Sequence, residues 1–132
     1  MTEVYETMPT NVEVIEACEF IRATPAGILD LEASQKLLSE MAQASTGLSD
    51  LHVLLDTRRA MTLLTTSDLW TLAQQVASAA QNRVRRTAVL CSDERFDHAR
   101  FFVMCAEQHS LNMRAFVDYE RAMDWLIHGD LQ

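Results

Sequence analysis

The sequence has little glycine, and its three glycines among 132 residues are isolated from one another. A phosphate-binding loop needs glycines close together in one short segment, so nucleotide binding of that kind is not expected. Cysteine is equally scarce. Cys18, Cys91 and Cys105 form no Cys-x-x-Cys pair, and an odd count does not fit a disulfide framework or a zinc knuckle. We therefore predict buried thiols, no metal site and no cofactor.

Long apolar runs and an excess of positive charge are also missing. No apolar segment approaches the roughly 18 residues that span a bilayer, and the first residues lack the basic start of a secretory signal. We expect a cytoplasmic protein without a membrane span. The net charge is -8, which makes nucleic acid an unfavourable partner because phosphate backbones repel the chain. The basic clusters at 58–59 and 83–86 are predicted to be solvated or salt-bridged.

The chain has the size and composition of one globular domain, which we predict over residues 1–132. Apolar residues make up 48% and charged residues 23%, so a core of ordinary size can form. From residue 30 onward, one-sided helical patterns alternate with short apolar runs. The predicted strands are 51–56, 87–91 and 113–117, and the predicted helices begin near Asp30, at Thr66 or Ser67, near residues 92–93 and at Asp118.

The N-terminal part has two interpretations. Residues 3–8 and 12–22 are rich in β-branched and aromatic residues, and Pro9-Thr-Asn11 has the composition of a turn, which together predict an antiparallel hairpin. Glutamates recurring every three residues within 12–22 would instead suit a helix, and we favour the strand. Later strands, joined through helices, must run parallel. The predicted fold is therefore α/β, with four helices and a mixed sheet of about five strands: the hairpin plus three parallel strands.

Several phrases of the sequence resemble the STAS-like proteins. They are the strand ending Val-Leu-Leu-Asp-Thr-Arg-Arg, the capped helix after it, and the final Phe-x-Asp-x-x-x-Ala-x-x-Trp-Leu. These small bacterial domains are similar to anti-sigma-factor antagonists and are sometimes grouped with the lipid-binding CRAL-TRIO fold. The similarity spans residues 30–128. It implies a single STAS-like domain that acts as a non-enzymatic regulatory module in bacteria, with a kinase or regulatory factor, or a second copy of the chain, as protein partner.

The resemblance also implies a position for regulation. In the antagonists, a partner kinase phosphorylates a serine in an Asp-Ser-Ser-Gly phrase at the start of the helix after the central strand. The corresponding phrase here is Thr65-Thr66-Ser67-Asp68, without the leading aspartate and trailing glycine, so Thr66 and Ser67 are the candidate positions. Arg58 lies at the carboxyl end of the preceding strand, where it could bind an anion. We therefore predict a partner or anion site at Arg58, Thr66 and Ser67, or else a helix cap beside surface arginines.

Two alternative functions remain open. The first is a carrier of a small apolar or lipid-like ligand, which an apolar cavity beneath helices 66–82 and 95–108 would favour. The second is an enzyme that uses Cys91 as nucleophile with Asp93 and His98, which would require these groups to lie within hydrogen-bond reach. Cys105 and His109 have a helical spacing that could hold a metal, but two ligands do not make a site.

Overall fold

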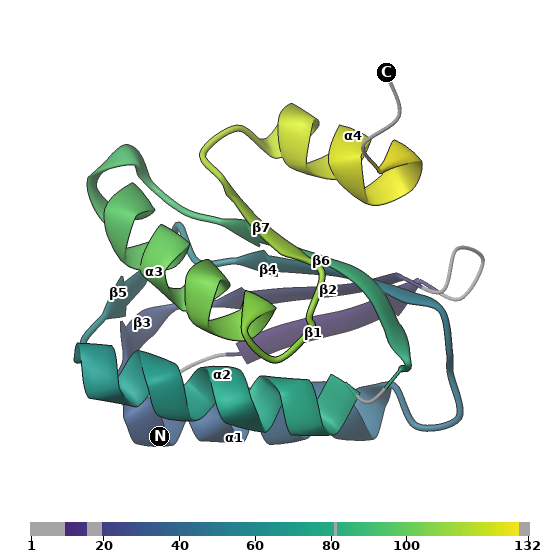
Figure 1. Cartoon of the computed structure of the whole chain (residues 1–132), viewed down its shortest axis with the longest axis horizontal. Coiled ribbons are helices and arrows are strands. Elements are labelled where there is room, and N and C mark those ends of the chain that lie inside the picture. Colours follow the sequence, from purple (N-terminus) through teal and green to yellow (C-terminus); the bar gives the residue numbers. More distant parts are fainter. Residues whose placement is uncertain (1–9, 16–19, 81, 130–132) are drawn as a thin grey trace, which may run out of the picture.

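The computed structural model describes residues 10–15, 20–80 and 82–129 of the chain (Figure 1). Its elements, in order, are β1 (Thr10–Ile15), β2 (Phe20–Pro25), β3 (Gly27–Leu29), α1 (Leu31–Ala44), β4 (Leu51–Asp56), β5 (Ala60–Thr62), α2 (Thr66–Ala80), β6 (Val84–Leu90), the short 3-10 helix η2 (Asp93–Arg95), α3 (Phe96–Glu107), β7 (Met113–Phe116) and α4 (Tyr119–His128). Over these described ranges, every helix is too short or too polar to cross a membrane.

The main sheet has five strands in the order β1-β2-β4-β6-β7. β1 is antiparallel to β2, and each of the other neighbouring pairs is parallel. This arrangement confirms the predicted mixed sheet, because an N-terminal hairpin is followed by three further parallel strands. A second, two-stranded parallel sheet joins β3 to β5, and the sequence did not predict it.

The N-terminal hairpin is present, but its position differs from the prediction. Thr10 and Asn11, which were predicted to form the turn, lie inside β1 and pair with Pro25 and Thr24. Segment 12–22 is therefore not one strand: β1 ends at Ile15 and β2 begins at Phe20. The strand interpretation holds for both described parts of the segment, since pairing within the sheet overrides the helical spacing of the glutamates. Residues 3–8 lie outside the described residues.

Both faces of the sheet are covered, so side chains along the central strands alternate between two cores. Leu54 of β4 and Leu90 of β6 point to one core, where they meet Leu126 of α4. Val53 and Val89, their neighbours along the strands, point to the opposite face, beneath the other helices. Each buried leucine contributes about 1.5–3 kcal/mol. α4 thus lies alone on one face of the sheet (Figure 1).

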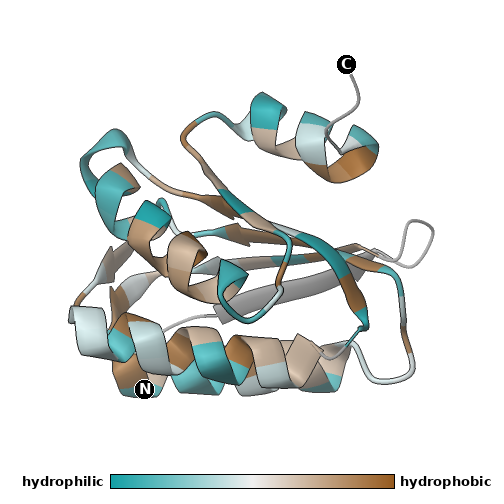
Figure 2. Ribbon diagram, in the orientation of Figure 1, coloured by the Kyte–Doolittle hydropathy of each residue, from teal (hydrophilic) through white to brown (hydrophobic). Residues whose placement is uncertain are grey.

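The opposite face carries α1, α2 and α3; in Figure 1, α1 and α2 run along the bottom of the view and α3 lies above them at the left. Apolar and hydrophilic bands alternate along α1 and α2 in Figure 2, as expected for amphipathic helices. Asp30 caps α1 as predicted, accepting the backbone N–H of Ala33 at 2.9 Å. α2 packs on α3 and α1, and its Ala73 belongs to the same buried core cluster as Val89 of β6.

Two arginines of the basic cluster 83–86 form hydrogen bonds from the sheet to residues at or near the ends of helices. Arg83 donates from Nη2 to the carbonyl oxygen and the hydroxyl of Ser45, both at 2.7 Å, and from Nε to the carbonyl oxygen of Leu48 at 3.4 Å. Arg86 donates from Nε to the carbonyl oxygen of Leu126 at 3.1 Å, near the end of α4. The bond to Leu126 satisfies a carbonyl that the end of α4 leaves without a partner, and the bonds from Arg83 hold the loop after α1. Both side chains therefore have structural roles beyond surface charge.

Candidate functional site

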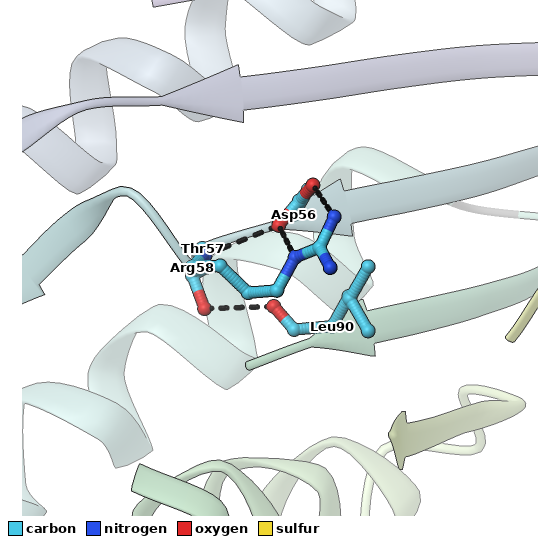
Figure 3. Close-up of polar contacts among 4 residues, drawn as sticks. All are labelled: Asp56, Thr57, Arg58 and Leu90. Atoms are coloured by element: carbon cyan, nitrogen blue, oxygen red, sulfur yellow. Dashed lines mark hydrogen bonds and ion pairs between the residues drawn. The ribbon is translucent and has the colours of Figure 1, made fainter. Parts of the chain in front are cut away.

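Arg58 lies in the turn after β4, where it binds a neighbouring carboxylate (Figure 3). Its Nε and Nη2 donate to Oδ1 and Oδ2 of Asp56 at 3.0 and 2.9 Å, and its backbone N–H also donates to Oδ1. Burial of Asp56 disfavours its charged form, but the hydrogen bonds from Arg58 and the charges of Arg58 and Arg22 outweigh burial. The pKa of Asp56 is therefore below its ordinary value.

Thr66 and Ser67 are exposed in the first turn of α2, and neither is its cap. The cap is Thr65, whose Oγ1 accepts the backbone N–H of Asp68 at 3.0 Å, while Oδ2 of Asp68 accepts the backbone N–H of Thr65 at 3.0 Å. This reciprocal pair is a capping box. The prediction of Thr66 or Ser67 as cap was therefore wrong by one or two residues, because Ser and Thr are equally good caps on sequence alone.

In the described part of the chain, no hydrogen bond or ion pair links the three residues of the predicted anion site, Arg58, Thr66 and Ser67. Within the described part of the chain, the hydrogen bonds and ion pairs of Arg58 go to Asp56, and none goes to Thr66 or Ser67. The adjacent Thr57 donates from Oγ1 to the carbonyl oxygen of Leu90 at 3.0 Å, which ties the end of β4 to β6 (Figure 3). Phosphorylation and anion binding at these positions stay predictions.

Cys91, Asp93 and His98 all follow the carboxyl end of β6, but no hydrogen bond links their side chains in the described ranges. The Sγ of Cys91 donates to the carbonyl oxygen of Phe116 at 3.5 Å. Burial, with the charge of Asp93, raises the pKa of Cys91, and burial, with the charge of Arg95, lowers the pKa of His98. A buried thiol with a raised pKa stays protonated at neutral pH and is a poor nucleophile.

The other cysteines do not form a metal centre in the described ranges, which contain no group of three or more potential ligands. Cys105 is buried, and burial raises the pKa of its thiol. His109, the second residue of the suggested pair, instead lies against the ring of Trp70, with 5.6 Å between ring centroids. Cys18 lies outside the described residues.

A cavity of about 170 Å³ lies between the sheet and helices α1, α2 and α3. It lies beneath α2 and α3, where the carrier hypothesis required one. Its lining is mostly aliphatic and comes from all three helices, both sheets and the loops between them. Representative lining residues are Leu37 and Met41 of α1, Leu51, Val53 and Leu55 of β4, Leu72 and Val76 of α2, Val89 of β6 and Phe102 of α3.

The polar groups in the lining are concentrated at one edge. α1, α2 and α3 each begin at the carboxyl edge of the parallel strands, and Ser34, Thr62, Arg95 and His98 line the cavity there. Three of their buried polar atoms have no hydrogen-bond partner: Oγ of Ser34, Oγ1 of Thr62 and Nε2 of His98. Such atoms are costly to leave unpaired, so they are the usual sign of a site that takes a ligand or water.

Comparison with known proteins identifies the architecture. No protein-family model and no curated protein matches the sequence. A solved structure does match: an uncharacterized protein of the DUF3478 family from Shewanella loihica PV-4, described as having a SpoIIAA-like fold. The match covers 96% of this chain and 98% of that chain, with 16% sequence identity and a TM-score of 0.61. The fold is SpoIIAA-like.

The SpoIIAA-like fold confirms the STAS-like architecture expected from the strand ending at Asp56 and from the C-terminal phrase. Within this fold, Arg58, Thr66 and Ser67 do not line the cavity, and Arg58 is paired with Asp56. Of the proposed enzyme residues, Cys91 and His98 line the cavity, whereas Asp93 does not. Ser34, Thr62 and Arg95 were missed, because nothing local distinguishes a serine in a helix from one that faces a cavity.

Proposed function

We propose that this chain is a non-enzymatic STAS-like module that binds a small apolar molecule between its sheet and helices α1–α3. The observation that carries the proposal is the aliphatic cavity of about 170 Å³. A cavity of about 150 Å³ with similar walls holds benzene, so this one accommodates a ring or a short alkyl chain. A long lipid chain would require the helices to move apart.

The energetics support an occupant. If this space were fully enclosed and dry, a cost of roughly 24 cal/mol per Å³ would make about 170 Å³ of void cost at most about 4 kcal/mol. That is a large part of the roughly 5–15 kcal/mol that stabilises a domain. A bound ligand would recover part of this cost.

The first prediction concerns filling the cavity. Val76 lines it from α2, and Val76→Phe would place a ring in the space that the ligand needs. We expect native mass spectrometry of the protein purified from its own cells to show a small bound molecule, and the variant to lose it. We also expect Val76→Phe to be at least as stable as the unsubstituted protein, because it replaces void with contacts.

The matched control is Val117→Phe. Val117 is 43% exposed in the loop before α4 and does not line the cavity. The Val117→Phe variant should retain the bound molecule. A ligand-free protein from native cells that also fails to bind any apolar probe, such as benzene, would reject the proposal.

A second candidate function is binding to another protein, as the regulatory interpretation expects. The small sheet β3–β5 has an inner and an outer face. On the inner face, Leu29 and Thr62 line the cavity. On the outer face, Ile28 and Met61 are paired in the register, and each is more than half exposed. Leu63, also more than half exposed, follows directly. An outer face of Ile28, Met61 and Leu63, which we call the β3–β5 patch, is an unusual concentration of exposed apolar side chains.

A further inference from the structure

The polar edge of the cavity carries a positive charge without a partner. Arg95 ends η2, and His98 lies in the first turn of α3. Both side chains are half-buried and line the cavity. Across the described ranges, no hydrogen bond or ion pair engages the guanidinium of Arg95. Burial lowers the pKa of His98, and the positive charge of Arg95 lowers it further. The two side chains are therefore near one another.

Two hydroxyls complete this edge. Ser34, in the first turn of α1, is only 9% exposed, and its Oγ is buried without a hydrogen-bond partner. Thr62, at the end of β5, has a buried and unpartnered Oγ1. These hydroxyls and His98 come from three different elements, yet all line one cavity. Unpaired buried donors are tolerated where a ligand supplies the acceptor.

The acidic groups nearby do not neutralise the site from within. Asp93, Glu94 and Asp97 flank Arg95 and His98 in the chain, but they are exposed and do not line the cavity. The start of α3, a helix of 12 residues, contributes a partial positive charge at the same place. An anionic group inside the cavity would therefore meet donors and positive charge directly, with the carboxylates toward solvent.

The opposite edge of the cavity offers no such groups. Leu51, Met41 and Val84 line it, and its polar side chains, Ser45 and Arg83, satisfy one another at 2.7 Å. Among the described residues, the unpartnered buried polar atoms of the cavity lining thus all lie at the carboxyl edge of the strands. A ligand that fits must be amphipathic, with its head at the first edge and its tail at the second.

We infer that the ligand is a small carboxylic acid with a ring or short alkyl tail, whose carboxylate contacts Arg95 and His98 and hydrogen-bonds with Ser34 or Thr62. This inference rests on the proposed function, because it names the chemical class that the cavity takes. A neutral alcohol would satisfy the hydroxyls and the imidazole but leave the guanidinium unused. A carboxylate uses both, since charge-assisted hydrogen bonds are roughly twice as strong as neutral ones.

The experiment compares two probes that share a phenyl ring of the size of the cavity, benzoate and benzyl alcohol, by NMR titration at pH 7. We expect benzoate to bind about ten-fold more tightly, as one charge-assisted contact predicts. Arg95→Gln should reduce this preference to about two-fold or less. Arg121→Gln is the control: it removes the same charge from α4, on the other face of the sheet, where Arg121 is 83% exposed.

The outcomes separate the two proposals. Equal binding of benzoate and benzyl alcohol, or a benzoate preference that survives Arg95→Gln, overturns the carboxylate inference and leaves the apolar-binding function intact. Failure of both probes to bind the folded, unsubstituted protein overturns both proposals. A preference lost in Arg95→Gln and retained in Arg121→Gln supports the inference.

Discussion

At the scale of single residues, Asp56 and Arg58 stabilise the turn that leads from the main sheet into β5. The pair is bidentate and partly shielded, with the Asp56 side chain 13% exposed and that of Arg58 44% exposed. Asp56 also accepts a backbone N–H, so its ionised form has three hydrogen bonds from one neighbour. Because these bonds favour the carboxylate, folding is coupled to the protonation of Asp56.

This coupling predicts a pH-dependent loss of stability. The pKa of Asp56 is lowered in the folded state, so its contribution is complete above the unfolded carboxyl pKa of about 4 and is lost as pH falls through the folded value. Asp56→Asn should lower the free energy of unfolding by about 1 kcal/mol at pH 7. Urea unfolding at pH 7 and at pH 2 measures the difference, which should shrink at the lower pH.

Asp118→Asn provides the comparison for Asp56→Asn. Asp118 forms a 4.0 Å contact with Arg121, and both side chains are more than half exposed. Exposed pairs of this kind contribute little, so the variant should change stability by only a few tenths of a kcal/mol. An Asp56→Asn effect that is no larger than this, or that does not depend on pH, would contradict the coupling.

At the scale of elements, the hydrogen bonds at the N-terminus of α2 fix the residue at which the helix begins. The capping box between Thr65 and Asp68 satisfies two backbone donors, one at the last residue before the helix and one in its first turn. The carboxylate of Asp68 already occupies the position that favours an anion at this helix start. A phosphate on Thr66 or Ser67 would have to share that position with Asp68, which adds like-charge repulsion.

The cap predicts an asymmetry between neighbouring threonines. Thr65→Ala should lower the free energy of unfolding by about 1 kcal/mol, because the N–H of Asp68 loses its acceptor. Thr66→Ala removes the same atoms from an exposed side chain one residue later and should cost less than about 0.5 kcal/mol. Chemical denaturation of both variants tests this. Equal losses, or a larger loss for Thr66→Ala, would show that the helix begins later.

At the scale of the whole molecule, the small sheet β3–β5 connects the two candidate functions. Its inner residues Leu29 and Thr62 line the cavity, and its outer residues Ile28 and Met61 form most of the β3–β5 patch. A ligand that shifts the inner face would also shift the patch, since only one layer of backbone separates them. If the protein partner proposed for this patch is a second copy of the chain, the interaction can be tested with the purified protein alone.

The exposed β3–β5 patch leads to a prediction about self-association when a charged residue is introduced into it. If the β3–β5 patch joins two copies, Ile28→Asp should convert a dimer to a monomer in analytical ultracentrifugation, because it buries a carboxylate in an apolar contact. Ile127→Asp is the matched control, since Ile127 is 60% exposed on α4 and Ile28 is 57% exposed. A protein that sediments as a monomer before substitution, or a dimer that survives Ile28→Asp, would exclude self-association through the patch.

The sequence by itself determined the features that depend on local chemistry. The cap at Asp30, the strand Leu51–Asp56 and the alternation of strands with one-sided helices follow from side-chain periodicity and hydrogen bonding within a few residues, and the structure confirms them. Those elements were enough to predict an α/β fold with a mixed sheet, and the resemblance of a few phrases to STAS-like proteins added the family. Where two neighbours had equal local merit, as Thr65 and Thr66 do as caps, the sequence could not choose between them.

The tertiary structure alone decided the candidate site. β3 pairs with β5 across more than thirty residues of chain, and this pairing places Thr62 over the cavity. Ser34 and His98 reach the same edge only because α1 and α3 begin at the same side of a parallel sheet. The void itself lies between the sheet and three helices that come from distant parts of the chain. A cavity depends on how elements are spaced in three dimensions, and no local pattern of residues encodes that spacing.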